Sequence, residues 1–174
     1  MFRRVALGLG IALLLAAPAA GKELKFTAAL SGDREPTVTG SKASAQAVIL
    51  VDTEKQTVDL RLYVSGLTVE SLSNGLRAAP MGPIHLHIYG GHDHNHAADA
   101  ALVFPAPYGP SYSPGEDSFK VETGEVPYAK GAALVNSKAT FDDFVNSMRD
   151  GRVVLNIHTN RFGDGEISGD VVPS

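Results

Sequence analysis

Five of the six histidines in this 174-residue chain lie within one window of twelve residues. They are His85, His87, His92, His94 and His96. The sixth, His158, lies far downstream, at the end of an apolar segment. Imidazole is the commonest metal ligand among protein side chains near neutral pH, and both copper and zinc accept it. The spacing therefore predicts a transition-metal site.

The absence of cysteine narrows the chemistry of such a site. Without thiolates, an ion must be held by imidazole and carboxylate, and Asp93 and Asp99 lie close to the loop histidines in sequence. We expect copper or zinc as the bound ion. Copper is preferred, because the affinity of nitrogen sites for divalent first-row metals peaks there.

Strand periodicity predicts where three of the imidazoles point. In segment 84–88 the apolar residues share one face of a strand, so His85 and His87 project from the other, about 6.6 Å apart along the chain. In segment 153–159 the same parity places His158 opposite the apolar face. If these two segments are neighbours in one sheet, the three imidazoles meet outside the hydrophobic core.

The loop histidines allow two interpretations. They follow Gly90 and Gly91, a hinge that could fold the loop back over the strand site and add a ligand from His92, His94 or His96. Alternatively, they form a solvated tract that binds metal opportunistically, as short histidine-rich stretches do.

Most of the chain is predicted to form strands. Alternating segments 24–30, 45–51 and 57–64 indicate half-buried strands, and segments 152–159 and 166–172 indicate two more. One helix is expected near 140–150, where Thr140 and Asp143 precede an apolar stripe that ends at Gly151. The proline-rich segment 104–115 is expected to be an ordered but irregular loop. The fold class predicted is an antiparallel β-sandwich or flattened barrel.

The N-terminal segment and the net charge indicate where the protein is located and which partners it has. Residues 1–19 combine Arg3 and Arg4, an apolar run and an Ala-Pro-Ala site, the pattern of a secretory signal peptide. We therefore expect a single exported domain over 24–174, periplasmic or secreted, with no membrane span in the mature chain. Loss of the two arginines takes the formal charge from −4 to −6, which argues against nucleic acid as a partner.

Three motifs, in this order along the chain, resemble the CHRD domain, the module repeated in chordin and found singly in exported bacterial proteins. The first is Phe26 to Pro36, where a strand runs into Leu-Ser-Gly; the second is His85 to Gly90; the third is Ile157 to Gly169. The resemblance implies an immunoglobulin-like or superoxide-dismutase-like Greek-key sandwich without a defined catalytic activity. Segment 92–115 is interpreted as an elaboration of this chain.

Residues Gly82 to His87 are also similar to the copper-binding strand of Cu/Zn superoxide dismutases. That similarity implies His85, His87 and His158 as copper ligands, with a fourth from the loop. The disulfide, zinc-loop pattern and guiding arginine of that family have no counterpart here.

Three functions therefore compete. The first is metal binding, for metal handling or structural use. The second is a copper redox enzyme, and the third is a non-catalytic extracellular interaction module, whose protein partner the sequence does not name. Enzymatic activity is the less favoured expectation, because fold similarity alone does not imply function.

Overall fold

The computed structural model describes residues 23–34, 36–92 and 100–174. Within these ranges eleven strands form one antiparallel sheet, whose main path runs β5-β4-β9-β10-β1-β2-β3-β7-β6, with β11 beside β1 and β8 beside β3. The strands are β1 (Glu23–Ser31), β2 (Ser44–Asp52), β3 (Thr57–Ser65), β4 (Ile84–Ile88), β5 (Ala101–Ala106), β6 (Tyr112–Pro114), β7 (Ser118–Glu122), β8 (Val126–Pro127), β9 (Val153–Ile157), β10 (Ile167–Asp170) and β11 (Val172–Pro173). The helices are α1 (Asn74–Ala78), α2 (Tyr128–Leu134) and α3 (Phe141–Arg149).

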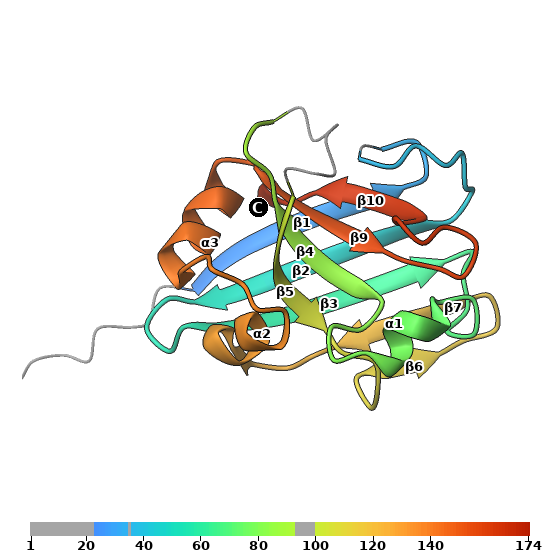
Figure 1. Cartoon of the computed structure of the whole chain (residues 1–174), viewed down its shortest axis with the longest axis horizontal. Helices are drawn as coiled ribbons and strands as arrows, with labels where there is room; N and C mark the ends of the chain where they lie inside the picture. Colours follow the sequence, from blue (N-terminus) through green and yellow to red (C-terminus); the bar gives the residue numbers. More distant parts are fainter. Residues whose placement is uncertain (1–22, 35, 93–99) are drawn as a thin grey trace, which may run out of the picture.

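The sheet curls into a half-barrel, so that its two halves share one core (Figure 1). Alternate residues of β2 and β3, such as Ile49 and Leu60, enter the same cluster of buried side chains as Leu86 of β4 and Leu155 of β9. Helices α2 and α3 close one end of this core, where Phe144 is fully buried. The all-β antiparallel class predicted from the sequence is confirmed.

The predicted strands and the predicted helix are found with small changes of boundary. Segments 45–51 and 57–64 form a hairpin in register, with Ile49 opposite Leu60. At the start of α3 the side chain of Thr140 accepts a hydrogen bond from the backbone N–H of Asp143, and the Asp143 carboxylate accepts one from the backbone N–H of Thr140. This reciprocal pair is the capping box that the sequence predicted.

The expectation of an irregular loop over 104–115 is wrong in part. Strand β5 continues through Pro105, and β6 occupies Tyr112–Pro114. A proline breaks the alternating pattern and removes a donor, but an edge strand tolerates it because one side of that strand forms no ladder. Strand β5 is such an edge. The part of segment 92–115 from residue 101 onward thus contributes two strands to the sheet.

In the described part of the chain, no helix is both long and apolar enough to cross a membrane. The predicted signal peptide and the loop positions 93–99 lie outside the described residues.

Candidate metal centre

Two neighbouring strands carry the three predicted ligands. Strands β4 and β9 pair antiparallel, with His85 opposite Asn156 and His87 opposite Val154 (Figure 1). His158 directly follows β9, and its backbone N–H donates to the carbonyl of Pro83 at 2.9 Å, which extends the pairing past the start of β4. The adjacency on which the parity argument depended is therefore present.

The three imidazoles gather on the face opposite the hydrophobic core. Ring centroids lie 4.5 Å apart for His85 and His158, 5.5 Å for His85 and His87, and 6.3 Å for His87 and His158. One ring nitrogen from each residue lies within 4.8 Å of the others. We call these three side chains the imidazole triad.

Backbone carbonyls fix which ring nitrogens of the triad carry protons. Nε2 of His85 lies 2.8 Å from the carbonyl oxygen of Gly82, and Nδ1 of His158 lies 2.7 Å from that of Gly163. A carbonyl oxygen only accepts, so each of these nitrogens donates its proton. The lone pairs are then on Nδ1 of His85 and Nε2 of His158.

These two lone-pair nitrogens point into the triad. Nδ1 of His85 lies 3.4 Å from Nε2 of His87. Nε2 of His158 is buried and has no hydrogen-bond partner among the described residues, and the same is true of Nδ1 of His87. A buried acceptor without a partner is uncommon, and Nε2 of His158 is therefore free to coordinate an ion. The unpartnered Nδ1 of His87 points away from the Nε2 that faces His85, so the same ion would not account for it.

Burial lowers the pKa of every imidazole in the triad. The pKa of His85 falls to about 3, mainly through desolvation and then through its neighbours His158 and His87, against the opposing hydrogen bond to Gly82. Desolvation, with His158 next, lowers the pKa of His87 to about 4. Desolvation also lowers the pKa of His158, although Gly163 and Asp164 act in the opposite direction. All three rings are therefore neutral at pH 7, the form that coordinates metal.

The triad is more enclosed than strand parity alone predicted. His85 and His158 are buried, and Val154 and Tyr89 are buried beside them without belonging to the main core. Sequence reasoning missed this second layer. The signal available was the uninterrupted apolar run Val153–Leu155, since a strand covered on both faces lacks the usual alternation.

The loop histidines do not join the triad in the described residues. His92 is exposed and is absent from the group of side chains close enough to share an ion. His94 and His96 lie outside the described residues. Their role as ligands stays a prediction from the sequence.

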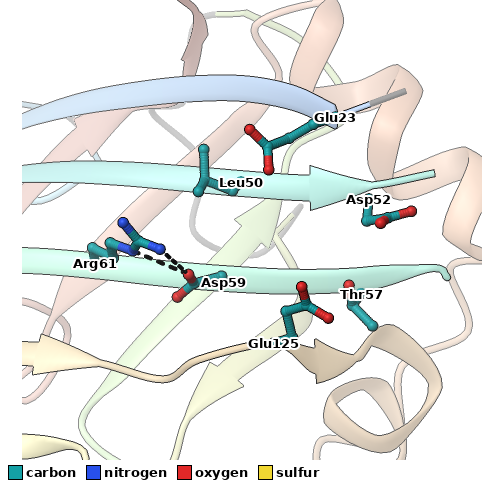
Figure 2. Close-up of a pocket in the computed structure, with 7 residues that line it drawn as sticks. All are labelled: Glu23, Leu50, Asp52, Thr57, Asp59, Arg61 and Glu125. Carbon is teal, nitrogen blue, oxygen red and sulfur yellow. Dashed lines mark hydrogen bonds and ion pairs between the residues drawn. The ribbon is translucent and has the colours of Figure 1, made fainter. Parts of the chain in front are cut away.

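Away from the triad, a hollow lies over the ends of β1, β2 and β3, and several acidic side chains line it (Figure 2). Figure 2 shows the guanidinium of Arg61 turned toward Asp59, to whose Oδ2 it donates two hydrogen bonds of 3.0 and 2.8 Å. The Lys55 ammonium donates to Glu125 at 3.0 Å. Over the described ranges, the imidazole triad is the one group of three or more potential ligands that converge. The charged side chains around this hollow form ion pairs, Arg61 with Asp59 and Lys55 with Glu125.

The model of the CHRD domain family matches residues 26–171, nearly the whole chain. The chain therefore belongs to the CHRD domain family, a class of non-catalytic, extracellular-type modules that are typically exported. The resemblance drawn from the three sequence motifs is confirmed. No curated protein and no solved structure matches the chain significantly.

Proposed function

We propose that this CHRD protein binds one copper or zinc ion through His85, His87 and His158, for metal handling or for structural use. The observation that carries the proposal is the convergence of three neutral imidazoles whose donor nitrogens lie within 4.8 Å of one another. Carbonyl groups hold two of these rings in the tautomer that turns a lone pair inward. Such outer hydrogen bonds are the usual way in which a ligating histidine is oriented.

The spacing of the donor atoms supports this proposal. Two nitrogens bound to one zinc ion at about 2.0–2.1 Å lie roughly 3.3–3.6 Å apart for angles between tetrahedral and trigonal. Nδ1 of His85 and Nε2 of His87 are 3.4 Å apart. The ligand nitrogen of His158 lies within 4.8 Å of the ligand nitrogens of the other two residues.

The identity of the ion and the location of the protein belong to the same proposal. Nitrogen ligands without thiolate suit Cu(II) and Zn(II), and the Irving–Williams order favours copper between them. Export by the N-terminal signal sequence would place the protein in the periplasm or outside the cell. There His92, His94 and His96 would add a second, histidine-rich binding tract.

A titration with matched variants tests the ligand assignment. The demetallated protein is titrated with Cu(II) and Zn(II) by calorimetry, beside a His85→Ala/His87→Ala variant and a His92→Ala/His94→Ala/His96→Ala variant. We expect one sub-micromolar equivalent in the unmodified protein. Loss of His85 and His87 should weaken it by more than the 10–100-fold that loss of an outer hydrogen-bond partner costs.

The loop variant is the control, because it removes three imidazoles and leaves the triad whole. It should keep the tight equivalent and lose only weaker binding. Tight binding that survives in the His85/His87 variant and disappears in the loop variant would reject the triad as the site.

Membership of the CHRD family favours a second candidate, a non-catalytic interaction module in which the histidines bind no ion. The same titration separates the two candidates. A protein that takes up neither Cu(II) nor Zn(II) tightly would leave the interaction module as the better account.

A further inference from the structure

A cavity of about 170 Å³ adjoins the imidazole triad. The rings of His87 and His158 form part of its wall, together with Tyr89, Asn156 and Asp164. An ion held by the triad would therefore have protein ligands on one side and this space on another. No carboxylate of the described residues joins the triad closely enough to act as a fourth ligand.

Asn156 supplies an independent sign that something binds in this cavity. It faces His85 across the strand pair, and only 3% of its surface is exposed. Its side-chain oxygen Oδ1 is buried and has no hydrogen-bond partner in the described part of the chain. A buried acceptor left without a donor destabilises the fold. An amide oxygen can only accept, so the missing partner is a donor.

Resting on the proposed metal site, we infer that the ion keeps one coordination position open to this cavity, and that an exchangeable water there donates to Oδ1 of Asn156. The cavity is large enough, because one water occupies roughly 30 Å³ of liquid volume. Asp164 in the wall makes the cavity unfavourable for small anions and suits a neutral ligand.

The inference distinguishes between the two uses of the metal. Structural zinc sites are closed by four protein ligands, whereas sites with three protein ligands and a water exchange that position with small solutes. A water-bearing triad therefore argues against a closed, purely structural site.

Electron paramagnetic resonance of the copper form tests this inference. The demetallated protein receives one equivalent of Cu(II), and its spectrum is compared in ordinary water and in water enriched in oxygen-17. A directly bound water should broaden the copper lines in the enriched solvent. Per copper ion bound, the Asn156→Leu variant should lose most of the broadening, because an apolar side chain replaces the acceptor that holds the water. Asn146→Leu, a change on the exposed face of α3, should leave it unaltered.

The outcomes separate this inference from the proposed function. Copper bound at one equivalent without broadening in the unmodified protein would overturn the open position and leave the triad intact. Failure to bind copper at all would overturn both. Full broadening in the Asn156→Leu variant would show that Asn156 does not hold the bound water.

Discussion

At the scale of single residues, the triad is defined by what its environment does to protonation. An exposed imidazole has a pKa near 6.5, so that near pH 6 protons compete with metal for it. Burial lowers the pKa of His85 to about 3 and that of His87 to about 4. The rings therefore remain neutral in mildly acidic solution, and metal binding should persist there.

The same shifts predict how the stability of the metal-free protein depends on pH. Below pH 6.5, the ordinary pKa of histidine, the imidazoles of the unfolded chain become protonated. Those of His85 and His87 stay neutral in the folded chain, because their pKa values are lower there. Folding stability contributed by the neutral rings is thus complete above pH 6.5, and it falls as the pH drops toward about 4. The slope is about 1.4 kcal/mol per pH unit for each imidazole.

Denaturant unfolding with a chelator present, at several pH values between 7 and 4.5, measures this slope. A His85→Asn/His87→Asn variant should show a flatter dependence, because neither replacement titrates in that range. The exposed His92→Asn change is the control and should follow the unmodified protein. Equal slopes in all three proteins would contradict the burial of neutral rings.

At the scale of elements, the ends of β4 and β9 determine the geometry of the triad. The carbonyl of Gly82, two residues before β4, orients His85, and the carbonyl of Gly163, in the turn after β9, orients His158. Gly82 has a φ of +66°, and a Cβ atom there would overlap the carbonyl oxygen of Ala106 at the end of β5. Only glycine fits both the conformation and the close approach of the two backbones.

Replacing Gly82 by alanine should therefore affect fold and site together. We expect the free energy of unfolding to fall by about 1–3 kcal/mol through backbone strain. Metal affinity should fall about 10–100-fold as the carbonyl moves away from Nε2 of His85. Denaturant unfolding and metal calorimetry measure the two effects.

Gly75→Ala in α1 is the matched control, since a Cβ atom there meets nothing within 4 Å. It should leave metal affinity unchanged, because the added methyl group displaces nothing. The free energy of unfolding should not fall, because alanine is the better helix former. A Gly82→Ala protein that loses stability but binds metal as before would show that the Gly82 carbonyl does not orient His85.

At the scale of the whole molecule, local periodicity predicted the strands and the direction of the ligands, and long-range packing provided what it missed. The alternation around His85 and His87 depends only on neighbouring residues, so the direction of these two side chains could be predicted from the sequence. The cavity beside the triad is lined in part by Pro36 and Ala100, which are distant in sequence from all three ligands. Periodicity carries no information about such contacts.

The cavity and its unsatisfied amide belong to the same long-range order. Asn156 reads as an ordinary outward-facing polar residue of a strand, and only the folded sheet places it opposite His85 under a second layer. Strand β5 was missed for a related reason, because its tolerance of Pro105 depends on its being at the edge of the sheet.

The most direct test of the metal site is a crystal structure of the copper- or zinc-loaded protein, with anomalous diffraction recorded at the absorption edge of the bound metal. The account predicts one strong peak about 2.0–2.1 Å from Nδ1 of His85 and from Nε2 of both His87 and His158. A loaded crystal whose anomalous peaks lie only at exposed histidines such as His92, with none between the three rings of the triad, would contradict it.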